Sequence, residues 1–125
     1  MKVDLVGGDP GAASILRFYD FDSGQVSSLA AALVRLSESA IGKSVVLAPS
    51  DLVATIQLRA VTAHVVGSDA GASVRDQAIE WSLSREGWLD AADRARVINA
   101  REPNAYQWLD TSGPLSVLLS PSGQW

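Results

Sequence analysis

Two stretches of helical periodicity, each flanked by short strand-like runs, set the narrowest limit on how this chain can fold. In both stretches apolar residues recur every three or four positions, which is the spacing of a helix that packs one face on a core. The first stripe consists of Val26, Leu29, Ala30, Leu33 and Leu36, and the second of Trp88, Ala92, Ala95 and Ile98. We therefore expect one helix over about 23–39, ending near Gly42, and a second helix that Ser84 caps.

The remaining apolar segments predict strands. They cover residues 1–6, 15–21, 44–48, 55–66, 78–83, 106–109 and 115–119. The fifth of these segments alternates apolar and polar residues, as a half-buried strand does, and the last two flank an Asp-Thr-Ser-Gly-Pro turn that predicts a hairpin. A phase slip near Ala60 predicts a β-bulge or bend, and residues 67–73 are predicted to form a loop.

The order of these segments is strand-strand-helix-strand-strand-strand-helix-strand-strand. This order predicts an α+β fold, in which a mainly antiparallel sheet of five to seven strands has two helices packed on one face. A length of 125 residues suits a single domain that spans residues 1–125.

One sequence echo raises the question of an internal duplication. Residues 44–50 (SVVLAPS) and 116–122 (SVLLSPS) agree at five of seven positions, and each segment follows a predicted strand and helix. A strand-helix-strand unit used twice would explain the echo. The alternative is chance, because a strand followed by a Pro-Ser turn is common in chains rich in alanine and valine.

The composition excludes several classes of protein and site. With 47% apolar and 19% charged residues, the chain has enough apolar surface to fold. The absence of cysteine excludes disulfides, thiolate catalysis and cysteine-ligated zinc, and it favours the reducing cytoplasm. The N-terminus lacks the apolar run of a signal peptide, and no apolar run approaches the roughly 20 residues that span a bilayer. We therefore expect a cytoplasmic protein with no membrane partner.

The charge balance bears on the kind of partner. The net charge is -4 and the isoelectric point is about 4.7, and lysine and arginine form no cluster along the chain. Nucleic acids are poor partners for such a chain, because binding to phosphate draws on clustered basic residues. An acidic surface suits a basic protein partner better.

Asp20 and Asp22 follow a strand segment, where paired carboxylates can bind a metal ion or a phosphoryl group. An EF-hand calcium loop would need glycine and glutamate where this chain has Gln25 and Ala31. The Asp-x-Asp pair also resembles the nucleophile motif of haloacid-dehalogenase-type phosphatases, but it lacks the Thr or Val that follows the second Asp by two positions in that family. We predict that Asp22 or Ser23 caps the first helix, which leaves Asp20 as an exposed acidic contact.

His64 is the only histidine, so any histidine base or ligand must be supplied by it. We expect it on the solvent-facing side of a strand, together with Thr62. The serines are interpreted as caps and turns rather than as nucleophiles, since no histidine or cysteine is expected to activate them. The Gly-rich segment 7–11 lacks the Lys-Ser/Thr ending of a phosphate-binding loop. No catalytic residue, metal site or cofactor is therefore predicted.

Four tryptophans are many for a chain of this size. Trp81 and Trp88 lie on the predicted core stripes. Trp108 is ambiguous, since its neighbour Leu109 is equally suited to face the core. Trp125 is expected to close one end of the core, and an exposed position would instead make it an anchor for a partner. The candidate partner-binding residues are therefore Asp20, Trp108 and Trp125.

These features favour a small acidic, non-enzymatic protein-binding domain, such as an inhibitor or immunity-type protein that covers a basic partner. The alternative is a small-ligand binder or hydrolase that uses Asp20, Asp22 or His64 in a pocket between the sheet and the helices. A homo-oligomer joined through a sheet edge is a third arrangement, with the strand over 56–66 as the candidate edge.

Overall fold

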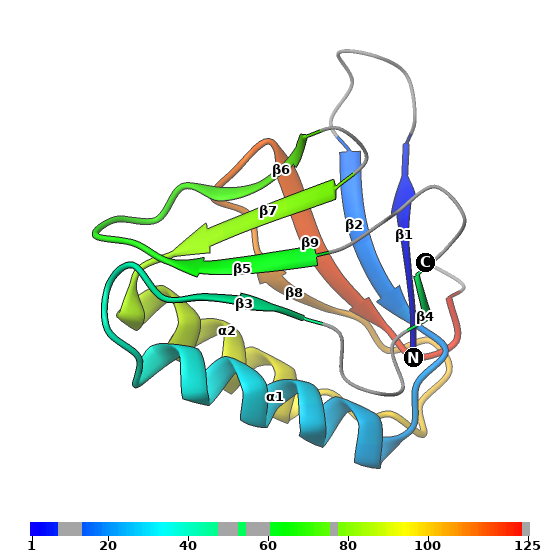
Figure 1. Cartoon of the computed structure of the whole chain (residues 1–125). Coiled ribbons are helices and arrows are strands. Elements are labelled where there is room, and N and C mark those ends of the chain that lie inside the picture. The colour runs from blue at the N-terminus through cyan, green and yellow to red at the C-terminus, as the bar shows by residue number, and fades with distance from the viewer. Residues whose placement is uncertain (8–13, 48–52, 55–60, 76–77, 124–125) are drawn as a thin grey trace.

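The computed structural model describes residues 1–7, 14–47, 53–54, 61–75 and 78–123 of the chain (Figure 1). The strands are β1 (Lys2–Val6), β2 (Ser14–Tyr19), β3 (Ser44–Val46), β4 (Val53–Ala54), β5 (Val61–Val65), β6 (Gly71–Arg75), β7 (Ala78–Leu83), β8 (Gln107–Asp110) and β9 (Leu115–Ser120). The helices are α1 (Ser23–Ser37) and α2 (Arg85–Val97). Trp125 and the predicted bend near Ala60 lie outside the described residues.

The strands form one mixed sheet in the order β3-β5-β7-β6-β9-β2-β1-β4, with β8 paired to β9. The pairs β1–β4, β2–β9 and β5–β7 are parallel, and the other pairs are antiparallel. The α+β class is confirmed, but the sheet is larger than predicted and mixed rather than mainly antiparallel. Parallel partners reach each other through long connections, so local periodicity did not indicate these neighbours.

Two of the strands are absent from the sequence prediction. β6 begins inside the segment that was predicted to be a loop, and it pairs antiparallel with residues 78–82 of β7. Its sequence, GASVR, starts with a glycine and two small residues and has only one branched apolar residue, Val74, so its strand pattern is weak. β4 has two described residues and pairs with β1. A segment of two residues is too short to show the alternation of apolar and polar residues that predicts a strand.

Apart from β4, the two halves of the chain contain the same order of elements. Each has an antiparallel hairpin, then a helix, then a second antiparallel pair: β1–β2, α1 and β3–β5 in the first half, and β6–β7, α2 and β8–β9 in the second. The sequence echo does not follow this order. It matches β3, the first strand of its pair, with β9, the last strand of its pair.

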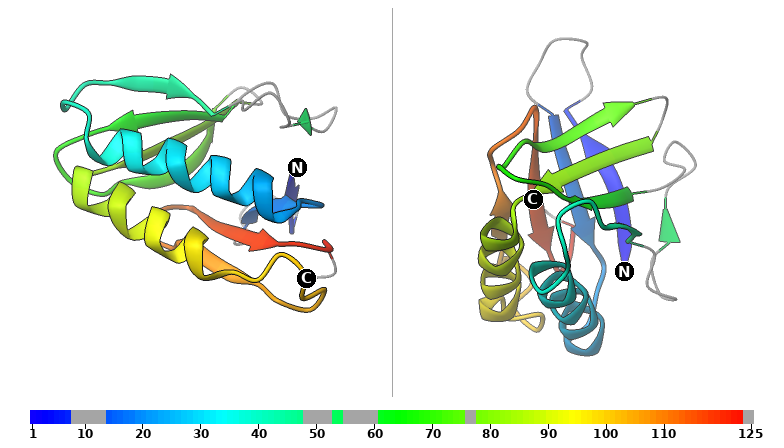
Figure 2. Two further views of the ribbon diagram at one scale, coloured as in Figure 1. Left: turned by 90° about the horizontal axis from the view of Figure 1, so that it is seen from below. Right: turned by 60° about the vertical axis from the view of Figure 1, so that its left-hand side comes forward.

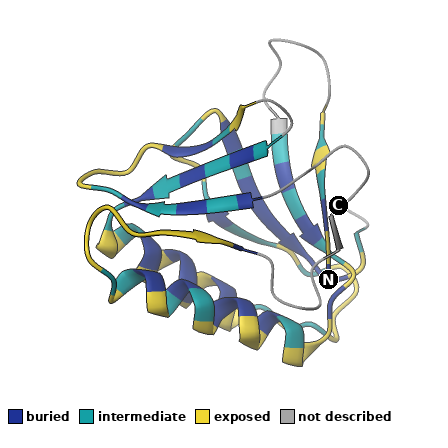
Figure 3. Cartoon of the chain, viewed as in Figure 1, coloured by how far each residue is buried: buried dark blue, intermediate teal, exposed yellow. Residues whose placement is uncertain are grey.

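Both helices lie on the same side of the sheet (Figures 1 and 2). The predicted stripe of α1 is buried in full, and α2 buries Trp88, Ala91, Ala92 and Ala95. The helices pack against each other and against the buried face of the sheet, while their outer faces are exposed (Figure 3). The core lies between these layers, as helical and strand periodicity together require.

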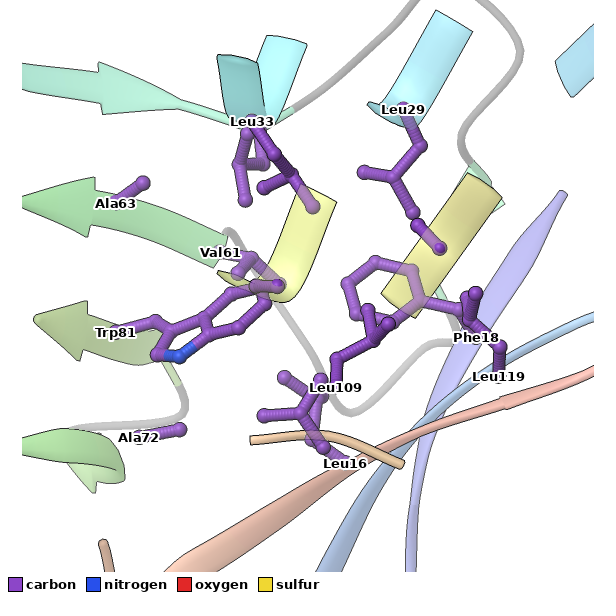
Figure 4. Close-up of a cluster of buried hydrophobic side chains, with 14 of the residues drawn as sticks. Leu16, Phe18, Leu29, Leu33, Val61, Ala63, Ala72, Trp81, Leu109 and Leu119 are labelled. Atoms are coloured by element: carbon purple, nitrogen blue, oxygen red, sulfur yellow. The ribbon is translucent and has the colours of Figure 1, made fainter. Parts of the chain in front are cut away.

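Trp81 fills the part of the core beneath β5, β6 and β7 (Figure 4). In the sheet register it lies between Ala63 and Ala72, and these two small side chains leave room for the indole. Its ring meets that of Trp88 edge to face, with centroids 4.8 Å apart. The prediction that both tryptophans belong to the core is confirmed, since each is 0% exposed.

Helix capping follows the sequence prediction closely. The side chain of Asp22 accepts from the backbone N–H of Gln25, and the Gln25 side chain accepts from the backbone N–H of Asp22, which is a complete capping box. Ser84 caps α2 by accepting from the N–H of Gly87. Both predicted caps are therefore confirmed.

Sheet edges differ from the prediction. Among the described residues, β5 lies between β3 and β7, so this part of the 56–66 segment is an interior strand. The ends of the main strand order are β3 and β4, and β8, which among the described strands pairs with β9 alone, is a further edge. No helix within the described ranges is long and apolar enough to cross a membrane.

Candidate functional site

One end of the molecule combines exposed apolar side chains with carboxylates. Here α1 ends, α2 begins and the loop between β5 and β6 passes close by, at the left of Figure 1. We call this surface the acidic end face and define it by five exposed residues. They are Glu38, Ile41, Asp69, Glu86 and Leu89.

Two shallow depressions shape the acidic end face. The first, of about 400 Å³, lies between the β5–β6 loop and the start of α2, and Ile41 and Asp69 are in its lining. The second, of about 530 Å³, lies between the two helices, and Glu38 and Leu89 are in its lining. Glu86 lines both, so the depressions form one continuous surface. Ile41 is 66% exposed and Leu89 46%, which is high for large apolar side chains.

The electrostatics of this surface are uneven. Glu38 is the C-cap of α1, where the helix dipole places partial negative charge and disfavours a carboxylate. Asp69 accepts hydrogen bonds from the backbone N–H and the hydroxyl of Ser84, both at 2.8 Å. Arg85 is the one cation among the described residues that line the two depressions, and its Nε donates to the Ser37 carbonyl at 3.1 Å. Within the described part of the chain, Glu38 forms no ion pair.

A second group of polar side chains lies on the face of the sheet that points away from the two helices. The Oγ of Ser44 is 2.6 Å from Nδ1 of His64, and Nε2 of His64 contacts a carboxylate oxygen of Glu80. These residues come from β3, β5 and β7, which are neighbours in the sheet. The alternating burial of β5 places Thr62 and His64 on the outer face, as predicted, while Val61, Ala63 and Val65 are buried.

The two aspartates of the Asp-x-Asp pair have separate positions. Asp22 is committed to the cap of α1. Asp20 has φ 54°, in the left-handed region that aspartate tolerates better than most residues, and its carboxylate pairs with Lys2 at 3.2 Å. Both lie at the start of α1, whereas Ser44, the strand partner of His64, follows the end of that helix. The structure therefore brings neither aspartate to His64.

Trp108 is half-buried on β8, opposite Leu118 of β9. Its neighbour Leu109 is 2% exposed, so Leu109 and not Trp108 faces the core. Trp125 lies outside the described residues.

Arg17 forms a charged cluster through contacts with other residues of the chain, namely Asp4, Tyr19 and Gly123. Its Nε and Nη2 donate to the two carboxylate oxygens of Asp4 at 3.0 and 2.7 Å, and Nη1 donates to the Gly123 carbonyl at 2.7 Å. The guanidinium also lies 4.5 Å from the centre of the Tyr19 ring. The hydrogen bond to Asp4 raises the pKa of Arg17, although burial acts in the opposite direction. This cluster fastens the last described residues to β2.

Among the described residues, no group of three or more histidine, aspartate or glutamate side chains could hold a metal ion. Comparison with protein-family models, curated proteins and solved structures finds no match. Function must therefore be inferred from the chemistry of the chain's own surfaces.

The sequence predicted neither the group formed by Ser44, His64 and Glu80 nor the acidic end face, and the reason is the same for both. Ser44, His64 and Glu80 lie in three separate strand segments, and only the register across the sheet brings their side chains together. The residues of the acidic end face likewise come from two helix ends and two loops. The one signal in the sequence was the position of Ile41, a large apolar residue between the first helix and the next strand.

Proposed function

We propose that this chain is a protein-binding domain, of the inhibitor or immunity type, that covers a basic partner in the cytoplasm through the acidic end face. The observation that carries the proposal is the exposure of Ile41 and Leu89 among Glu38, Asp69 and Glu86. Apolar anchors surrounded by polar groups are the usual anatomy of a protein interface.

The position of Glu38 supports a basic partner in particular. A carboxylate at the C-terminal end of a helix lies in the unfavourable field of the helix dipole. An arginine or lysine of a partner would relieve that repulsion and would pair with the carboxylate. The net charge of -4 would also attract a basic protein from a distance and raise its rate of association.

Asp20, one of the partner contacts predicted from the sequence, lies away from the acidic end face. Asp20 lies at the start of α1 and the acidic end face at its end, so a helix of 15 residues separates them. At a rise of about 1.5 Å per residue, that separation is on the order of 20 Å. Asp20 would therefore contact the partner only if the interface extended along the whole of α1.

Charge reversal tests the proposal directly. We expect a tagged chain to capture a basic protein from the source lysate, and the double variant Glu38→Lys and Glu86→Lys to bind that protein on the order of 100-fold more weakly. The reason is that juxtaposed like charges cost several kcal/mol at an interface. Capture is measured by quantitative mass spectrometry, and affinity by titration with the captured protein.

The matched control carries the same change in net charge elsewhere. Asp93→Lys with Glu102→Lys alters two exposed carboxylates outside the acidic end face, and this variant is expected to bind as the unmodified chain does. Equal binding by both double variants would contradict the proposal. So would failure of the unmodified chain to capture any basic protein.

A further inference from the structure

The outer face of the sheet carries an arrangement that the protein-binding proposal does not use. Ser44 and His64 are direct partners across the antiparallel pair of β3 and β5. Backbone bonds from Val65 N–H to the Lys43 carbonyl and from Leu47 N–H to the Val61 carbonyl mark the hydrogen-bonded positions of this pair. Ser44 and His64 therefore occupy a non-hydrogen-bonded position, where side chains approach most closely. This explains the 2.6 Å contact between Ser44 Oγ and His64 Nδ1.

Glu80 completes the arrangement from the next strand. It lies opposite Thr62 in the parallel pair of β5 and β7, so it reaches His64 along the diagonal. An ionised carboxylate can only accept hydrogen bonds, so in the neutral imidazole the proton resides on Nε2. The lone pair of Nδ1 then faces the hydroxyl of Ser44. The Ser44 hydroxyl, the His64 imidazole and the Glu80 carboxylate thus contact one another in the order nucleophile, general base and orienting group, as in acyl-transfer sites.

We infer that Ser44 is an activated nucleophile for acyl transfer, with His64 as its general base and Glu80 as the residue that positions His64. Ser44 Oγ would attack the carbonyl carbon of an ester while its proton passes to His64 Nδ1. His64 would then return that proton to the departing alkoxide as the ester C–O bond breaks, which leaves an acyl-Ser44 and a free alcohol. Water, activated by the same histidine, would hydrolyse the acyl-serine to a carboxylic acid and restore Ser44.

The surroundings of Ser44 indicate the class of substrate. Val46 lies two residues further along β3, hence on the same face, and is 56% exposed, so it offers an apolar surface to a short acyl chain. The backbone N–H of Ser44 points away from β5, because Ser44 is in a non-hydrogen-bonded position, and β3 has no second neighbour within the described ranges. This N–H faces the side from which a carbonyl oxygen can approach. A small ester with a short apolar acyl group fits these features.

The test uses p-nitrophenyl butyrate as the probe. We expect release of p-nitrophenol and a butyryl group on Ser44, located by peptide mass spectrometry. Ser44→Ala should abolish this modification, while Ser27→Ala, which removes an exposed serine on α1, should leave it unchanged. His64→Gln should slow acylation of Ser44 by roughly 100-fold or more, the usual contribution of a general base. Glu80→Gln should slow it less, since the amide can still hold the ring.

Two results would overturn the inference: no butyryl group on Ser44 in the unmodified chain, or unchanged acylation in a His64→Gln variant whose circular dichroism is native. If His64→Gln does not fold, the unmodified chain decides. The butyryl group should accumulate on Ser44 in preference to the exposed Ser27. Equal acylation of the two serines would overturn the inference. Binding of a basic partner does not enter this experiment, so its outcome is independent of the acidic end face.

Discussion

Replacing Trp81 by alanine is expected to lower the free energy of unfolding by about 3–5 kcal/mol, the range for removal of a buried aromatic side chain. The indole is fully buried and contacts Trp88 edge to face. Its neighbours across the sheet are Ala63 and Ala72, which are too small to fill the cavity. Its Nε1 also donates to a carboxylate oxygen of Asp110 at 2.9 Å, and this bond would be lost.

Urea unfolding followed by circular dichroism measures this effect. Trp81→Phe keeps a ring in the core and loses the hydrogen bond to Asp110, so its cost should lie below that of Trp81→Ala. Val97→Ala is the surface control, because Val97 is 72% exposed, and it should change stability by less than about 0.5 kcal/mol. A loss below about 1 kcal/mol for Trp81→Ala would show that this tryptophan is not a central core residue.

Replacing Gly71 by alanine is expected to cost about 3 kcal/mol or more. Gly71 has φ 80°, and a Cβ there would lie 2.2 Å from the backbone nitrogen of Gly113 and 2.3 Å from its Cα. These are backbone atoms next to the start of β9, so relief requires the strands to move apart. The contact matters because, in the described part of the chain, β6 and β9 pair at one position, Ala72 with Leu115. This pair joins the part of the sheet formed by β3, β5, β7 and β6 to the part formed by β9, β2, β1 and β4.

Gly42 provides a matched control for the substitution at Gly71. It also has a positive φ, 100°, but a Cβ there meets no atom of the described residues within 4 Å beyond its chain neighbours. Gly42→Ala should therefore cost only the backbone strain, about 1–2 kcal/mol. The difference between the two variants isolates the steric clash, which overpacking data place at about 1–3 kcal/mol. Equal losses of stability in urea unfolding would contradict the close approach of Gly71 and Gly113.

Much of the local structure could be predicted from the sequence, because local residues determine it. The capping box at Asp22, the cap at Ser84 and the buried stripe of α1 each depend on residues within four positions of one another. β7 was predicted with its observed bounds, since its side chains alternate without interruption. The helix periodicity also indicated α2 and its core tryptophan.

The sheet order and both functional surfaces could not be predicted in the same way. The parallel pairs β2–β9 and β5–β7 join strands from opposite halves of the chain, and no local pattern specifies such neighbours. Ser44, His64 and Glu80 meet only because of the registers of β3, β5 and β7. β6 was missed because its small residues give a weak strand pattern, although its pairing with β7 is extensive.

The central claim is that the acidic end face binds a basic protein, and nuclear magnetic resonance tests it most directly. The ¹⁵N-labelled chain would be titrated with the captured partner while backbone amide shifts are followed. We predict that the largest changes fall at the end of α1, in the loop that follows it, in the β5–β6 loop and at the start of α2, around Glu38, Ile41, Asp69, Glu86 and Leu89. Changes confined to the start of α1 around Asp20, or to β8 around Trp108, would contradict the claim.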